Sequence, residues 1–167
     1  MVKGKGPTRI SREAFSRFVL LSFGGVKCDK AGKYLGSMLY FDFLTSKYYI
    51  YYRNRKSPAF VISIRDVFWE IYIEDNLRLS SEEVDQDSFS EMTPEIESRR
   101  FRKVIFSERA IVDFQFERDF SLKIDLTNRW GEVDRIVEVR AAGEILSISP
   151  KGYCYRWPDR EIVERLP

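Results

Sequence analysis

Histidine is missing from all 167 residues of the sequence, and this absence excludes several large classes of function. Without an imidazole the chain cannot form a Ser-His-Asp or Cys-His nucleophilic site, an HExxH zinc site, or the usual general base for neutral pH. The sequence also lacks a Walker-type phosphate loop, the GxSxG motif and an EF-hand loop. No Asp or Glu stands two residues before a Lys, which excludes the strict D…D/ExK arrangement of many metal-dependent nucleases. We therefore expect no catalytic residue, no metal site and no cofactor, and a protein that is not an enzyme.

Cysteine and long apolar runs are also scarce. Cys28 and Cys154 are too far apart for a local metal-binding knuckle and too few for a disulfide scaffold, so we expect two buried free thiols. No window approaches the roughly 20 apolar residues that a membrane-spanning helix needs. The basic start of the chain is followed by "FVLLSF" (18–23), which is too short for the apolar region of a signal peptide. We expect a cytoplasmic protein without a membrane segment.

The composition is that of a globular protein with a sheet-rich core. Apolar residues make up 44% of the chain and aromatic residues 15%, and aromatic side chains are favoured in strands. The length suits a single domain, 1–167, that buries about 70% of its unfolded surface. Within it we expect a flexible arm at 1–9 and an acidic loop at 80–93. The net charge of +2 is too small to indicate a partner, so the distribution of charge is more informative.

The apolar pattern predicts an α+β fold, mostly antiparallel sheet with two or three short helices; the alternative is all-β. Residues 37–75 predict three or four strands. Residues 11–23 predict a helix that starts at Ser11, or alternatively a strand over 18–23. A further helix start is indicated at Thr93 and Pro94, and a C-terminal helix after Asp159.

Two hairpins can be read in register from their alternation. In "DFQFERDFSLKIDL" (113–126), placing Phe116 opposite Phe120 requires an odd loop, most simply three residues (117–119) that end on a left-handed Asp. The same register places Asp113 opposite Lys123, and we expect that lysine to neutralise it. In the second hairpin (136–149), Val139 opposite Leu146 requires an even loop, either 142–143 or 141–144, with Gly143 at positive φ. The segment after it predicts an edge strand at about 153–157.

The first candidate for a functional surface is the acidic stretch 80–98, which holds seven carboxylates and no Lys or Arg. Such a row attracts a basic partner and speeds its association. The candidate partner-binding residues are Glu82, Glu83, Asp85, Asp87, Phe89 and Glu91. Phe89 and Met92 would supply the apolar anchors that an interface needs. The competing interpretation is an exposed loop that carries charge only because it is solvated.

The second candidate is "KYYIYYRNRK" (47–56), within a segment from Phe43 to Arg65 that has five cations and no acid. Strand aromatics that stack on bases, with cations for phosphates, are a known way to bind single-stranded nucleic acid. The candidate nucleic-acid-binding residues are Tyr49, Tyr51, Arg53 and Arg55. The competing interpretation is a buried central strand.

The third candidate is the polar side of the 113–126 hairpin. Asp113 and Asp125 could share a hard metal ion, which would make the protein a carboxylate-dependent enzyme. The competing interpretation is the solvated side of a sheet.

The order of these segments resembles a known group of proteins. "VFWEIYIEDNLRL" is followed by "FRKVIFSERAIVDFQFERDFSLKIDL" and by a last hairpin that contains "ILSISPKG". This layout, over roughly residues 65–153, is similar to small β-rich bacterial proteins of toxin-immunity families. The resemblance implies a protein that binds and occludes a cognate toxin and needs no cofactor. It carries no site residue across, because it rests on strand layout alone.

Overall fold

The structure is a computed structural model that describes residues 6–34, 37–43, 48–52, 55–58, 60–129, 135–141, 143–158 and 162–165. For 48–52, 55–58, 129, 158 and 162–165 it describes the backbone. Within these ranges strands predominate and every strand pairing is antiparallel.

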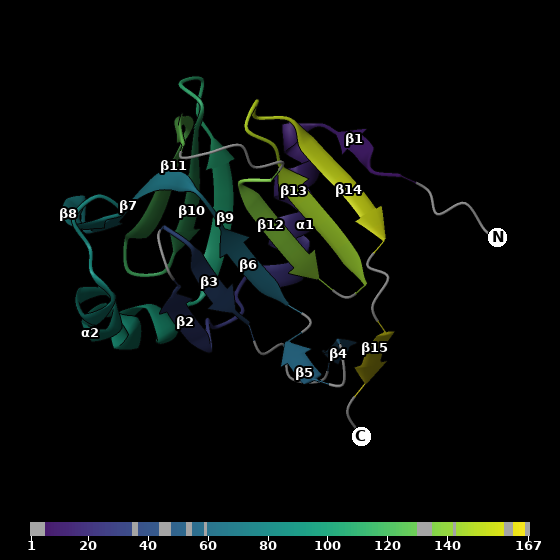
Figure 1. Cartoon of the computed structure of the whole chain (residues 1–167), viewed down its shortest axis with the longest axis horizontal. Helices are drawn as coiled ribbons and strands as arrows, with labels where there is room; N and C mark the ends of the chain where they lie inside the picture. Colours follow the sequence, from purple (N-terminus) through teal and green to yellow (C-terminus); the bar gives the residue numbers. More distant parts are fainter. Residues whose placement is uncertain are drawn as a thin grey trace.

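The largest sheet has seven strands and faces the viewer in Figure 1. Its strands, in spatial order, are β1 (Thr8–Ile10), β14 (Cys154–Pro158), β13 (Glu144–Ile148), β12 (Val137–Ala141), β6 (Val61–Ile64), β3 (Leu39–Asp42) and β2 (Lys30–Lys33). A second sheet of five strands stands at the upper left in this view: β8 (Asn76–Ser80), β7 (Val67–Ile73), β11 (Phe120–Arg129), β10 (Ile111–Phe116) and β9 (Phe101–Phe106). A small third sheet contains β15 (Ile162–Arg165), β4 (Tyr48–Tyr52) and β5 (Arg55–Pro58).

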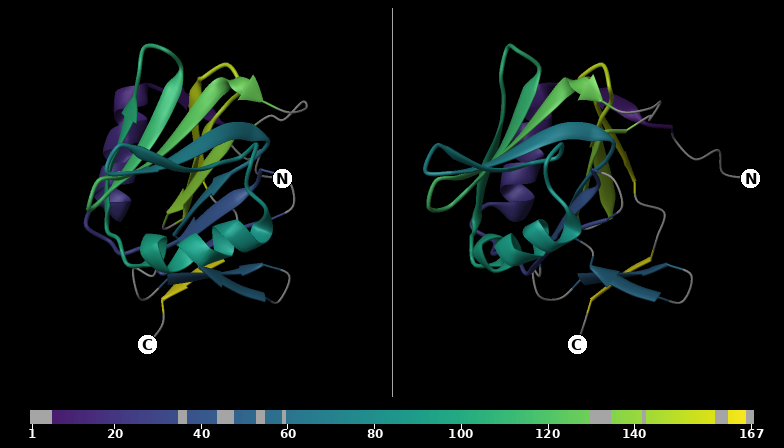
Figure 2. Two further views of the ribbon diagram at one scale, coloured as in Figure 1. Left: turned by 90° about the vertical axis from the view of Figure 1, so that its left-hand side faces the viewer. Right: turned by 60° about the vertical axis from the view of Figure 1, so that its left-hand side comes forward.

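Two helices are present in the described residues. Helix α1 (Arg12–Phe23) begins after Ser11, whose hydroxyl accepts from the Ala14 amide at 3.0 Å, so the helical alternative for 11–23 is confirmed. Helix α2 (Gln86–Glu97) runs across the lower end of the two larger sheets, while α1 lies along their side (Figure 2). Neither helix has the length and the apolar run needed to cross a lipid bilayer.

The core forms between the two larger sheets and is rich in aromatic rings. Along β7 the alternation is complete, since Val67, Trp69, Ile71 and Ile73 are all buried. The rings of Phe41 on one sheet and Phe116 on the other lie 6.1 Å apart. The indole of Trp69 donates to the Ser37 carbonyl at 2.7 Å, which satisfies its buried N–H. Cys28 and Cys154 are buried free thiols, as expected.

Both hairpin registers are confirmed. Phe116 pairs with Phe120 across the loop 117–119, where Arg118 and Asp119 have φ values of 55° and 52°. Val139 pairs with Leu146 across a two-residue loop, and Gly143 has φ of 90°. These registers could be predicted because paired residues share one side of the sheet. An odd loop in the first hairpin and an even loop in the second keep each apolar row on one side.

The predicted helix start at Thr93 and Pro94 is wrong, and so is the acidic loop for residues 86–93. The helix begins about two turns earlier, because the Asp85 carboxylate accepts from the Ser88 amide at 2.7 Å and caps it. Pro94 lies inside the helix, where it lacks the N–H that would bond the Ser90 carbonyl. The Thr93 hydroxyl donates to that carbonyl instead, at 2.8 Å.

Three further expectations are corrected by pairings between distant segments. The segment 37–75 contains five strands rather than three or four. The predicted C-terminal helix is wrong because 162–165 form strand β15 on β4, which suits the β-branched Ile162 and Val163. Strand β14 is not an edge, because residues 8–10, part of which was expected to be a flexible arm, pair with it as β1.

Candidate functional site

The acidic candidate residues lie on and just before α2. Glu82, Glu83, Asp85, Asp87 and Glu91 are exposed, and the stretch 80–98 contains no cation. Asp87 and Glu91 are four residues apart, as are Glu91 and Glu95, so these three side chains follow one line along the helix surface. Like charges at this spacing destabilise a helix by about 0.2–0.5 kcal/mol per pair. This line of three carboxylates therefore slightly lowers the stability of α2.

Phe89 and Met92 are not part of this exposed surface, so the prediction that they anchor a partner is wrong. Phe89 is 1% exposed and Met92 is 8% exposed. The Phe89 ring lies 6.2 Å from the Trp69 ring at an interplanar angle of 74°. The helical period places them, with Ile96, on the side opposite the carboxylates, so they attach α2 to the core.

The seven carboxylates of this stretch divide by the contacts they make. Glu95 forms an ion pair with Arg99 at 3.5 Å. Asp85 caps α2, and the hydrogen bonds from Ser88 lower the pKa of its carboxyl. Glu97 accepts from the Ala31 amide of β2 at 3.0 Å. Within the part of the chain that the structure describes, no hydrogen bond or ion pair engages the side chains of Glu82, Glu83, Asp87 and Glu91. We call these four residues the acidic face.

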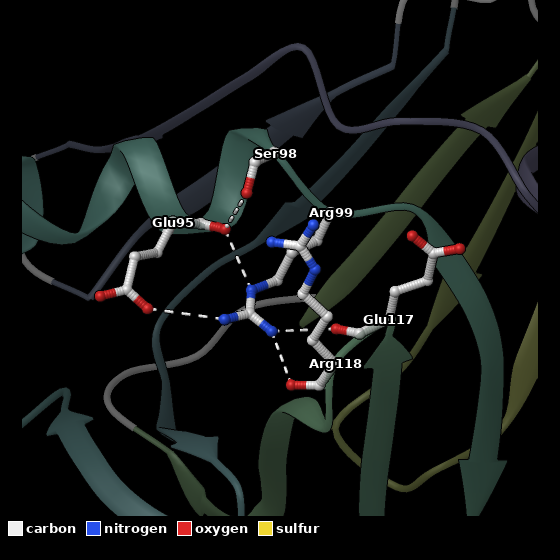
Figure 3. A network of polar contacts seen from close by, with 5 residues as sticks. All are labelled: Glu95, Ser98, Arg99, Glu117 and Arg118. Atoms are coloured by element: carbon white, nitrogen blue, oxygen red, sulfur yellow. Dashed lines mark hydrogen bonds and ion pairs between the residues drawn. The ribbon is translucent and has the colours of Figure 1, made fainter.

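A buried arginine fixes the C-terminal end of α2 (Figure 3). Arg99 is 7% exposed, and its Nε donates to the Glu95 carbonyl at 3.0 Å. Its Nη1 donates to the carbonyls of Glu117 and Arg118, at 3.0 and 2.6 Å, in the β10–β11 loop. Arg99 therefore joins the end of α2 to the β10–β11 hairpin, while the Asp85 cap holds the start of the helix.

The two aspartates on the polar side of the 113–126 hairpin accept hydrogen bonds from nearby residues. Asp113 accepts from the Gln115 amide and the Ser121 hydroxyl, and Asp125 accepts from the amide and the hydroxyl of Thr127. Lys123 is the Cα partner of Asp113, but its ammonium lies over the Tyr72 ring, 4.4 Å from the centroid. The expected neutralisation of Asp113 by Lys123 is therefore wrong.

The same side shows no arrangement suited to a metal ion. No group of three His, Cys, Asp or Glu side chains within the described ranges could hold one. Neither Asp113 nor Asp125 has a third acidic neighbour there that would complete a ligand set.

The Tyr- and Arg-rich candidate lies mostly outside the described residues. Tyr49 and Tyr51 belong to β4 and Arg55 to β5, for which only the backbone is described, and Arg53 lies outside the described ranges. The backbone places β4 between β15 and β5, as the central strand of the small sheet. Binding of nucleic acid by these four residues stays a prediction.

One titratable residue was missed at the sequence level. Asp42 on β3 lies on the side of the seven-stranded sheet that points away from the core, next to Lys30 of β2 in the register. Burial raises the pKa of its carboxyl to about 6, with a further contribution from Asp29 and an opposing one from Lys30. Its position in "LYFDF" showed that it lies on the polar side of a strand, but not that this side is partly buried.

Comparisons with protein-family models, with curated proteins and with solved structures find no match for this chain. The resemblance to toxin-immunity proteins thus stays a prediction, and the functional argument rests on the geometry described above.

Proposed function

We propose that this protein is a non-enzymatic binding protein that docks a basic protein partner through the acidic face. The single observation that carries the proposal is a set of four exposed carboxylates without a partner among the described residues. Two of them lie on α2, whose other side is buried, and two lie in the turn before it. Uncompensated charge of one sign on a surface attracts a partner of the opposite sign over about one Debye length, which is ~8–10 Å at physiological salt.

The rigidity of α2 supports the same proposal. The helix is capped by Asp85, attached to β2 by Glu97, joined to the β10–β11 loop by Arg99, and packed on the core through Phe89. A partner that binds the acidic face therefore meets carboxylates whose backbone positions are already fixed. Pre-organisation of this kind lowers the entropy that association costs.

In its most specific form, the proposal is an immunity-type inhibitor that binds and occludes a basic toxin in the bacterial cytoplasm. The strand layout over residues 65–153 supports this form, and so does the absence of histidine from the sequence. An inhibitor that blocks its target by occupying it needs no catalytic group and no cofactor, so its surface charge and shape carry the whole function.

The experiment is a capture from cells that make the protein natively, with three tagged baits at low salt. The first is the wild type. The second, the amide variant, carries Glu82→Gln, Glu83→Gln, Asp87→Asn and Glu91→Gln. The third is a matched control, Glu82→Asp, Glu83→Asp, Asp87→Glu and Glu91→Asp, which changes the same four side chains and keeps their charge.

We expect the wild type and the charge-retaining control to retain one basic protein in stoichiometric amount, released by salt, and the amide variant to lose it. Equal capture by the amide variant would remove the acidic face from the interface. Nucleic acid that co-elutes with all three baits, without a basic protein, would contradict the proposal and favour the strand at 47–56 as the binding site.

A further inference from the structure

A second charged region lies at the other end of the sheets, around the turn between β13 and β14. Two adjoining hollows of about 350 and 310 Å³ open there and share Arg12, Lys151 and Gly152 in their walls. Arg9 on β1 completes the larger hollow, and Thr127 on β11 lines the smaller one. We call Arg9, Arg12 and Lys151, with the hollows they line, the basic pocket. It does not touch the acidic face and is independent of the function proposed above.

The basic pocket carries a net positive charge. Its walls contain three cations and no carboxylate, and none of the three forms an ion pair within the described ranges. The nearest acid in sequence, Glu13, is engaged by its own backbone amide and by the Ser11 hydroxyl, which lower the pKa of its carboxyl, with a smaller contribution from the charge of Arg12. Cys154 also lines the pocket, but burial raises the pKa of its thiol to about 11, so the thiol is neutral at physiological pH.

The two guanidinium groups are held in place by aromatic rings. Arg9 lies over the Tyr153 ring, 3.8 Å from its centroid, and Arg12 lies 5.2 Å from the centroid of Phe106. Gly152 has φ of 76°, and a Cβ added to it would lie 3.0 Å from Nη2 of Arg12, so the turn leaves room for that guanidinium. Stacking restrains each guanidinium while its N–H groups stay available for a ligand.

We propose that the basic pocket binds the phosphate group of a small phosphorylated molecule. Guanidinium groups donate in a fixed fork that matches two oxygens of a phosphate, and a lysine ammonium adds a compact third charge. The hollows are of the size, about 300 Å³ and above, that small ligands occupy. Their concave shape distinguishes the pocket from the open basic groove that tracks a nucleic-acid backbone over many nucleotides.

The test is a calorimetric titration of the full chain with pyrophosphate, a small probe with high phosphate charge. The variants are Arg12→Gln, Lys151→Gln and the double variant, with Arg102→Gln as the matched control, because Arg102 is an exposed cation on β9 that lines neither hollow. Urea unfolding of each variant confirms that it is folded. A further variant, Arg12→Lys, keeps the charge and removes the fork.

We expect one saturable site, binding about 10-fold weaker in each single variant, and unchanged binding in Arg102→Gln. The affinity of Arg12→Lys for pyrophosphate should lie between those of the wild type and Arg12→Gln. No saturable binding at millimolar pyrophosphate would overturn the proposal, and so would an equal loss in Arg102→Gln. A single-stranded oligonucleotide that binds through Arg12 and Lys151 where pyrophosphate does not would overturn it in favour of a nucleic-acid site.

Discussion

The acidic face and the basic pocket differ in shape as well as in sign. The acidic face lies on α2 and in the turn before it, where its four carboxylates are exposed to solvent and line neither hollow of the basic pocket. The basic pocket is hollow, and its guanidinium groups rest on aromatic rings. In Figure 1, α2 lies at the lower left and the β13–β14 turn at the top, so the two regions are at opposite ends of the sheets.

Under the two proposals, this difference corresponds to two modes of recognition. Charge on a convex surface acts at long range and changes mainly the rate of association, because partly solvated charges contribute little once a complex has formed. Charge in a hollow acts at short range on a ligand that enters it, and changes the equilibrium affinity. The four predictions that follow separate the residues that build these regions from the residues that meet a partner.

The largest effect is expected for Phe89→Ala, at a position first assigned to the interface. Because the ring is buried against Trp69, its removal should lower the free energy of unfolding by about 3–5 kcal/mol. The measurement is urea unfolding, with Glu91→Ala as the exposed control on the same helix. Wild-type stability combined with weaker partner binding would return Phe89 to the interface.

The next effect is expected for Arg99→Met, which removes the link between α2 and the β10–β11 loop. Three carbonyl groups lose a charged donor, so we expect a loss of about 2–3 kcal/mol in the free energy of unfolding. Arg102→Met, at an exposed position on β9, should leave it unchanged. Equal stability of the two variants would show that α2 is held by its apolar side alone.

A smaller effect, with a characteristic pH dependence, is expected for Asp42. Its carboxyl has a pKa of about 6 in the folded protein, above the value near 4 of an unfolded chain, so the folded state binds more protons between these values. Stability should therefore fall as the pH rises from about 4 to about 6. In Asp42→Asn this part of the decline should disappear, as measured by urea unfolding across the range. If the free energy of unfolding of the wild type and of Asp42→Asn changed with pH in parallel, the raised pKa of Asp42 would be contradicted.

The smallest effect separates two neighbouring carboxylates. Asp85→Ala should reduce stability because it removes the cap of α2, whereas Asp87→Ala should not. The pKa of Asp85 is lowered, so its stabilisation is present above the unfolded pKa and is lost as the pH falls through the lower folded value. The difference in thermal midpoint between the wild type and Asp85→Ala should accordingly disappear at acidic pH. Asp85→Ser, which keeps a capping oxygen, should restore the midpoint; failure to do so would assign the effect to charge instead.

Local patterns predicted those parts of the fold in which both partners of a contact are close in sequence. The registers of the two hairpins followed from alternation and loop parity, and the start of α1 followed from Ser11. The pairing of β1 with β14 and of β15 with β4 joins opposite ends of the chain to distant strands, and nothing in either segment indicates its partner. The start of α2 was misplaced because a proline after a threonine is typical of a first turn, while Asp85 caps the helix earlier.

The two charged regions also differ in whether their residues are close together in the sequence. The acidic face was visible in the sequence because its four residues lie within ten positions of each other. Its apolar anchors were wrongly assigned, because exposure was inferred from the charge of the neighbours rather than from the helical period. The basic pocket was not visible, because Arg12 and Lys151 are brought together only by the folded sheet. Each of these cations alone looks like an ordinary solvated side chain.

The most direct test of the account is the association rate of the captured basic partner, measured at low and at high salt with three proteins. These are the wild type, the amide variant of the acidic face, and Arg12→Gln/Lys151→Gln in the basic pocket. We expect the amide variant to associate about 10-fold or more slowly than the wild type at low salt and to lose most of its salt dependence, while the pocket variant keeps the dependence of the wild type. An amide variant with the rate and salt dependence of the wild type would show that the partner does not approach through α2, and would contradict the account.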